Sequence, residues 1–311
     1  MTKDSIGIDI SKDTFDVHRL TTGAVAQFPN SAVGLRKLLR WIGDDLPDLV
    51  VHEATGRYHR TLEQGLAGVL PLVKVNPLQA RRFAQACGTR AKSDAVDARM
   101  LALMGAALEL VPDRPADRDH HALKELRVER VALIAERTRI LNRSKTRTLA
   151  LLKRHDSARL ARITRQLAEL DALLRKLVLQ CPRRARAFRI LCSIPGMGEV
   201  TAMAILVECP EIGTMSRKQV ASLAGLAPMT RQSGQWQGKA FIQGGRRFLR
   251  AALYMPALVA SRHNPDLKRK YQAMVAAGKP PKVALTTLMR KLIELANALV
   301  REDRQWTPKG A

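Results

Sequence analysis

Aromatic residues, cysteines and acids are all scarce in this chain. Trp, Tyr and Phe together make up 4% of the 311 residues, fewer than we expect of a protein that binds single strands by stacking bases on aromatic rings. The four cysteines (Cys87, Cys181, Cys192 and Cys209) form no Cys-x-x-Cys pair. A structural zinc site is therefore not indicated, and we expect reduced thiols of the kind found in cytoplasmic proteins.

Long apolar runs are absent too. The longest in the second half of the chain, residues 251–261, is bounded by Arg250 and Arg262 and is far shorter than the ~20 residues that a bilayer requires. No apolar segment follows the first residues, so we also expect no secretory leader. A protein with 46% apolar and 26% charged residues has the composition of a folded, soluble domain.

The acids that are present are heavily outnumbered. Lys and Arg number 53 against 28 Asp and Glu, a formal net charge of +25. A compact body with this charge repels itself unless a polyanion neutralises it, which favours a nucleic-acid partner held by its phosphates. A cationic protein that binds membrane surfaces is the alternative interpretation.

The excess charge is concentrated in one stretch. Residues 1–110 hold 14 basic and 12 acidic residues, a net of +2, whereas residues 137–189 hold 16 basic and 3 acidic residues, a net of +13. The alternative to nucleic-acid contact is a solvated helix surface. We predict that this stretch binds nucleic acid through Arg143, Lys145, Arg147, Lys153 and Arg154.

The hydrophobic pattern predicts an α/β head and a helical remainder. The expected strands of the head are 6–10, 15–20, 24–28, 49–51 and 72–75, and the expected helices are 31–46, 58–66, one starting at Pro77 and one running from the N-cap Ser93 to about 110. This order fits a mixed sheet covered by helices. Residues 116–180 predict two long helices with a break near 155–157, and the tail is helical with glycine punctuation.

Four acids of the head occupy positions at which the predicted sheet would bring their side chains close together. Asp9 lies on the first strand, Glu53 follows the strand 49–51, and Asp94 and Asp97 share one face at the start of a helix. Four clustered carboxylates cannot all stay ionised without cations. Two Mg²⁺ ions roughly 4 Å apart would resolve this and would serve phosphoryl transfer. Alternatively, each acid is a solvated carboxylate at a strand or helix end.

The motifs around these acids resemble a known family. Gly7-Ile8-Asp9-Ile10-Ser11-Lys12, Glu53-Ala54-Thr55-Gly56 and the run from Lys92 to Arg99 are similar to the DEDD motifs of one group of bacterial insertion-sequence transposases, now described as bridge-RNA-guided recombinases. The resemblance implies a RuvC-like (RNase H-type) head. It also implies that Asp9, Glu53, Asp94 and Asp97 are the metal-binding and catalytic acids.

The tail carries two further motifs. The order Pro195-Gly196-Met197-Gly198 before an apolar helix looks like a helix-hairpin-helix, in which Gly196 and Gly198 let backbone amides meet a phosphate. An ordinary helix–helix turn is the alternative. A glycine-rich block then contains Ser233, with cations at Lys239, Arg246, Arg247 and Arg250. By chemistry alone this serine is an ordinary loop residue, but the family resemblance puts the catalytic serine on Ser233. We predict that the four cations contact nucleic acid.

The patterns predict an α/β domain over 1–112, a basic helical or coiled-coil segment over 113–186 and a mainly α-helical domain over 187–311. The resemblance implies that the first is RuvC-like and that the last is a transposase domain. The resemblance implies a cytoplasmic, bacterial DNA recombinase that uses Mg²⁺ and a serine–DNA intermediate. Its partners would be donor and target duplexes, a structured bridge RNA and further copies of the chain, as a dimer or tetramer. The alternatives are a hydrolytic RuvC-like junction resolvase and a non-catalytic basic nucleic-acid-binding protein.

Overall fold

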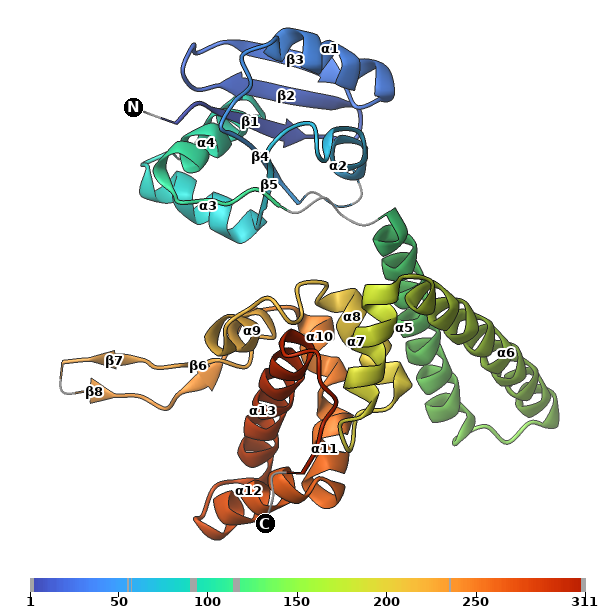
Figure 1. Ribbon diagram of the computed structural model, residues 1–311. Coiled ribbons are helices and arrows are strands. Elements are labelled where there is room, and N and C mark those ends of the chain that lie inside the picture. Colours follow the sequence, from blue (N-terminus) through green and yellow to red (C-terminus); the bar gives the residue numbers. More distant parts are fainter. Residues whose placement is uncertain are drawn as a thin grey trace. The chain divides into compact units, whose positions relative to one another are not determined.

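The computed structural model describes residues 3–54, 56, 58–89, 94–113, 118–234 and 236–308. The chain forms two compact units, residues 1–117 and 118–311 (Figure 1). The expected division at 112 and 186 stays a prediction. Thr55, Lys92 and the expected N-cap Ser93 lie outside the described residues.

The first unit is built on a five-stranded mixed sheet with the strand order β3-β2-β1-β4-β5. β1 pairs antiparallel with β2 and parallel with β4, while β5 continues the parallel side. The elements, in chain order, are β1 (Ser5–Ile10), β2 (Thr14–Arg19), β3 (Val25–Pro29), α1 (Ala32–Ile42), β4 (Leu49–Glu53), α2 (Arg60–Leu66), β5 (Leu72–Val75), α3 (Pro77–Ala86) and α4 (Asp94–Ala107). The expected mixed sheet covered by helices is confirmed.

The two faces of this sheet are covered differently. Alternate residues of β1 (Ile6, Ile8 and Ile10) are buried against the apolar sides of α1 and α2. Val51 and Val73 face the other way and pack with residues of α4. This alternation follows from the period of two along a strand, and it leaves Gly7 and Asp9 on the α4 side.

The second unit is mainly helical. Its helices are α5 (Arg118–Ser144), α6 (Ala150–Gln180), α7 (Pro182–Cys192), α8 (Glu199–Glu208), α9 (Arg217–Leu223), α10 (Arg247–Ala252), α11 (Tyr254–His263), α12 (Pro265–Ala276) and α13 (Pro281–Arg301). A single apolar core joins α7, α8, α11 and α13 with the start of α5 and the end of α6. None of the described helices is both long and apolar enough to span a bilayer.

Helices α5 and α6 form the expected pair of long helices, but the expected break near 155–157 is wrong. The connection lies at residues 145–149. Asp156 is 2% exposed inside α6, and its carboxylate lies 3.3 Å from Arg147 and 3.7 Å from Arg143. The polar residues 155–157 can lie within a helix because Arg143 and Arg147 compensate the charge of Asp156. A small apolar cluster of Leu133, Ile140 and Ile163 joins the two helices; a coiled coil stays a prediction.

A two-stranded arm, residues 228–242, interrupts the helical unit and was not expected from the sequence. β6 (Pro228–Met229) pairs with β9 (Phe241–Ile242), and β7 (Gln232–Ser233) pairs with β8 (Trp236–Gln237). Figure 1 shows this pair of strands extending away from the helices of its own unit.

Candidate functional site

Helix α4 lies directly on the backbone of β1. A Cβ atom on Gly7 would overlap the carbonyl oxygen of Ala98 and the amide nitrogen of Ala102. One turn further along α4, a Cβ on Gly105 would overlap the hydroxyl of Ser5. Small residues on both elements therefore permit a close approach, and they fix α4 antiparallel to β1 with its first turn toward the end of β1 that carries Asp9.

The strand register brings Asp9 beside Glu53. Ile8 pairs with His52 between the parallel strands β1 and β4. Asp9 and Glu53 are the next residue on each strand and therefore lie side by side. Val51 contacts the Gly105 position of α4, and because side chains alternate along a strand, Glu53 faces α4 as well. Both carboxylates thus point toward the first turn of α4, which holds Asp94 and Asp97.

The electrostatics of Asp9 reflect this convergence. Burial, together with the negative charges of Asp94, Asp97 and Glu53, raises the pKa of Asp9 to about 6. Like charges in one place disfavour ionisation of each other. The four acids predicted from the sequence therefore share one electrostatic site, although they come from three separate elements.

This site suits a hard divalent cation in its chemistry. Carboxylate oxygens are preferred ligands of Mg²⁺, and the raised pKa of Asp9 reflects its burial and the negative charge gathered around it. Among the described residues, however, no three His, Cys, Asp or Glu side chains stand close enough together to hold a metal ion as they are. The acids converge on one region but are not preset at ligand distances.

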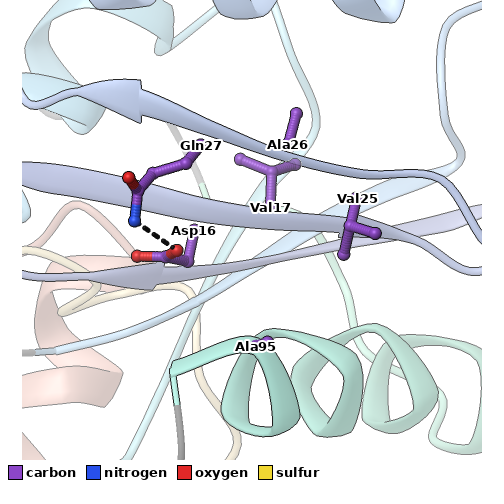
Figure 2. A pocket seen from close by; sticks show the side chains of 6 residues that line it. All are labelled: Asp16, Val17, Val25, Ala26, Gln27 and Ala95. Atoms are coloured by element: carbon purple, nitrogen blue, oxygen red, sulfur yellow. Dashed lines mark hydrogen bonds between the residues drawn. The ribbon is translucent and has the colours of Figure 1, made fainter.

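A fifth acid belongs to the same row across the sheet. Asp16 of β2 pairs with Asp9 in the antiparallel register, and its carboxylate accepts a hydrogen bond from Gln27 of β3 at 2.8 Å. Figure 2 shows the two side chains next to a small hollow that Ala95 of α4 also lines. Only the pairing of β1 with β2 reveals that Asp16 neighbours the acidic site.

The opposite face of β4 carries a separate polar cluster. Glu63 of α2 lies 3.3 Å from Nε2 of the fully buried His52 and 2.7 Å from Nζ of Lys74. Burial acts against its ionisation, but the hydrogen bonds with His52 and Lys74 prevail and lower the pKa of Glu63 to about 2. Because the ammonium group of Lys74 compensates this carboxylate, the cluster fixes the end of β4 rather than attracting a cation.

Ser233 lies at the end of the arm. It is exposed and pairs with Trp236 across the final turn, where Gly234 adopts a positive φ of 56°. That conformation favours glycine. Trp236 is 60% exposed, and Lys239 is exposed between β8 and β9. Ser233 is therefore exposed to solvent and accessible to a large substrate.

Two of the predicted cations hold the base of the arm. The Arg246 guanidinium forms a bidentate ion pair with Glu211, both contacts at 2.7 Å, and donates to the Glu208 carbonyl. Arg250 donates to the carbonyl oxygens of Gly225 and Gly244. These contacts support a structural contribution from Arg246 and Arg250, whereas Arg247 is exposed beside the Phe248 ring. Their nucleic-acid contacts stay predictions.

The five predicted cations of the helical pair also divide into two groups. Arg143 and Arg147 face the buried carboxylate of Asp156. Lys145, Lys153 and Arg154 are exposed around the connection between α5 and α6. Only this second group is fully available to a phosphate backbone.

The predicted glycine hairpin joins α7 to α8. Gly196 has a φ of 96° and packs on the backbone of Ala260 in α11, where a Cβ would lie 2.8 Å from the Ala260 nitrogen. Gly198 is exposed at the start of α8, with open space where a Cβ would be. The tight turn is thus observed, and Gly198 is the glycine whose surroundings leave room for a phosphate.

Comparison with known proteins agrees with these features. Residues 6–146 match a profile described as a transposase, the DEDD domain of IS110 elements, and residues 188–272 match one described as "Transposase IS116/IS110/IS902 family". The chain is 31% identical to the pilin gene-inverting proteins of Moraxella lacunata and Moraxella bovis, over 98% of this chain and of each relative. It is 34% identical to a 43.6 kDa protein of insertion element IS110 from Streptomyces coelicolor, over 36% of this chain and 28% of that protein.

The first match contains all four converging acids, and the second contains the arm with Ser233 and its base. Both matches occur in the order expected from the sequence motifs, and the full-length relatives span both. The chain therefore belongs to the IS116/IS110/IS902 family of transposases.

Proposed function

We propose that this transposase cuts and rejoins DNA through a covalent bond between Ser233 and a DNA phosphate, with Mg²⁺ held by Asp9, Glu53, Asp94 and Asp97. The family acts on DNA, and the relatives from Moraxella are named for inverting a gene. The observation that carries the proposal is the convergence of the four acids from β1, β4 and α4, which together with burial raises the pKa of Asp9 to about 6.

The four carboxylates bind the metal in this proposal, and their convergence from β1, β4 and α4 supports it. Bound Mg²⁺ would supply charge stabilisation for the phosphate oxygens during transfer. Asp9, Glu53, Asp94 and Asp97 would hold the ion, although their side chains are not preset at ligand distances.

Ser233 supplies the nucleophile. Its Oγ forms a bond to phosphorus, the bond from phosphorus to one bridging oxygen of the DNA breaks, the Oγ proton passes to solvent, and the leaving oxygen becomes a hydroxyl. Rejoining is the reverse transfer, in which a DNA hydroxyl attacks the same phosphorus and Ser233 regains its proton. The phosphodiester energy is conserved, and no further reactant is consumed. The exposed position of Ser233 on the arm supports this function.

The nucleic-acid partners are donor DNA, target DNA and a structured bridge RNA. The net charge of +25 and the exposed cations around residues 145–154 support binding through phosphates. A content of 4% aromatic residues gives little capacity to read splayed bases. Base pairing with a guide would then provide the sequence choice, while the protein holds the backbone.

The working form is an oligomer. One Ser233 cuts one strand, so exchange between two duplexes needs four serines and hence four chains. The arm supports a site in which Ser233 of one subunit meets the acids of another. Mixed oligomers of Asp9→Ala and Ser233→Ala chains should then regain activity. Failure of complementation in confirmed mixed oligomers would place both parts in one chain.

The test is a suicide DNA substrate incubated with wild type, Ser233→Ala, Ser216→Ala and Ser222→Ala, followed by denaturing gels. Ser216 caps α9 and Ser222 lies within it, so they are matched controls away from the arm. We expect a shifted protein–DNA band with wild type and both controls but not with Ser233→Ala. A band with Ser233→Ala would move the nucleophile elsewhere. Cleavage without any band would establish a hydrolytic resolvase.

A further inference from the structure

A cleft of about 720 Å³ opens from the acidic site along the groove between α3 and α4. Two of the four acids form part of its wall, and the rest of the wall comes from one side of α3, from the segment after it and from the inner side of α4. The residues that carry the argument are Glu53, Arg81, Ala84, Gln85, Asp97 and Met100. The cleft is therefore continuous with the place where the phosphate would be cut.

Helix α3 stands off from its neighbours. None of its residues is buried, and only Ala80 and Phe83 pack partly on the apolar cluster beneath it. The wall residues Pro77, Ala80, Arg81, Ala84 and Gln85 recur every three or four positions, which places them on one side of the helix. The groove is thus open because α3 does not close against α4.

The chemistry of the cleft changes across its width. Arg81 and Gln85 are exposed, and α3 contains no acid. The ion pairs of the described residues leave Arg81 without a carboxylate partner, although the acidic site adjoins it. The opposite wall, on α4, is apolar at Met100 and Leu101. One side can therefore pair with phosphates and the other can contact a deoxyribose or a base.

The volume of the cleft limits the size of the ligand that it can bind. Clefts of ~300–1,000 Å³ enclose a single small molecule, so this one admits a nucleotide or two of one strand and excludes a duplex. We propose that the cleft binds the unpaired DNA nucleotide next to the phosphate that is cut, with Arg81 on the adjacent phosphate and the apolar wall against its sugar and base. The inference rests on the proposed function because it takes the acidic site as the place of cutting.

The test is photocrosslinking of a 4-thiothymidine-containing dT6 oligonucleotide to the full-length protein in EDTA, with crosslinks mapped by mass spectrometry. The yield on peptides from 77–89 and 94–107, followed against oligonucleotide concentration, gives a dissociation constant for the cleft alone. The variants are Arg81→Ala, Ala84→Leu, which fills the cleft without changing charge, and Arg82→Ala. Arg82 is the matched control because it is exposed on the same helix but does not line the cleft.

We expect Arg81→Ala to weaken binding about tenfold and to lower the slope of log K against log salt by about 0.7, the value for one phosphate contact of a single strand. Ala84→Leu should weaken binding with an unchanged slope, and Arg82→Ala should change neither. Equal behaviour of Arg81→Ala and Arg82→Ala would overturn the proposal. A preference for rU6 over dT6 would also overturn it, since the occupant would then be RNA.

The covalent-band assay on the same proteins separates this inference from the proposed function. With the recombinase proposal intact, Arg81→Ala should raise the DNA concentration needed for half-maximal band formation but reach the wild-type rate at saturation. Absence of the band in wild type would contradict the serine mechanism, yet the crosslinks in EDTA would still report whether the cleft binds a single strand.

Discussion

Gly7 of β1 lies against Ala98 of α4 so closely that a Cβ atom on Gly7 would overlap the Ala98 carbonyl oxygen. This contact sets the distance between the strand that carries Asp9 and the helix that carries Asp94 and Asp97. The atoms that this Cβ would meet are backbone atoms of α4, and they cannot move aside as the end of a long side chain would. The spacing of the acidic site therefore depends on the absence of one methyl group.

We predict that Gly7→Ala pushes α4 away from β1. The cost of overpacking is roughly 1–3 kcal/mol, and we expect the upper part of this range because backbone meets backbone. Thermal unfolding should show the loss of stability, and strand cleavage should fall even at temperatures where the variant is folded. Gly198→Ala is the control for the stability measurement, since a Cβ there meets nothing within 4 Å. Unaltered cleavage by Gly7→Ala would show that the site tolerates displacement of α4.

A second prediction concerns the charge of Asp9. The raised pKa means that ionised Asp9 destabilises the metal-free protein, so wild type should lose stability as the pH rises from about 4 to about 6 and remain constant above. Asp9→Asn removes this cost. We expect the variant to be more stable at pH 7 by on the order of 2–3 kcal/mol, while losing cleavage.

Denaturant unfolding of both proteins in EDTA across this pH range is the measurement. Added Mg²⁺ should stabilise wild type more than Asp9→Asn, because the ligand binds only the folded state of the protein that has the full set of acids. A stability difference that is the same at pH 4 and pH 7 would mean that Asp9 does not titrate in this window.

The sheet and its acids could be predicted because each is indicated by a pattern of residues that are close together in the sequence. The alternation of Ile6, Ile8 and Ile10 predicts a strand, and the spacing of Asp94 and Asp97 puts both on one side of a helix. The pairing of Asp16 with Asp9 depends on strand register, which no local pattern marks. The arm was missed because its strands are two residues long, although a Ser-Gly pair ahead of Trp236 is a turn signal.

The assignment of the cations was similarly limited. The prediction that Arg246 and Arg250 contact nucleic acid came from their place in the block around Ser233, and a position in the sequence does not distinguish a free guanidinium from one that pairs within the protein. Glu211 lies 35 positions before Arg246, and the tertiary fold alone brings them together.

A third prediction follows for the base of the arm. Arg246→Ala and Glu211→Ala should each lower stability by about 1–2 kcal/mol, a discounted value because the pair is partly exposed to solvent. The double variant should cost less than the sum, since each single change leaves the other charge unpaired. Thermal unfolding of the four proteins in a double-mutant cycle measures this coupling. Lys239→Ala is the control, because Lys239 is exposed between β8 and β9, and it should leave stability unchanged. Strict additivity would show that Arg246 does not hold the arm through Glu211.

The last prediction separates the cations near the connection of α5 and α6. Neutralising Lys145, Lys153 and Arg154 together should leave stability unchanged and lower the slope of log K against log salt by roughly 0.7–0.9 for each lost phosphate contact. Arg147→Ala should act differently, because it leaves the carboxylate of Asp156 buried with one fewer cation beside it. We expect a loss of stability that Asp156→Asn in the same chain partly restores.

Binding of structured RNA and duplex DNA at several salt concentrations, together with thermal unfolding, measures both effects. An unchanged slope in the triple variant would assign these residues to a solvated surface, and an unchanged stability of Arg147→Ala would show that Arg143 alone compensates Asp156.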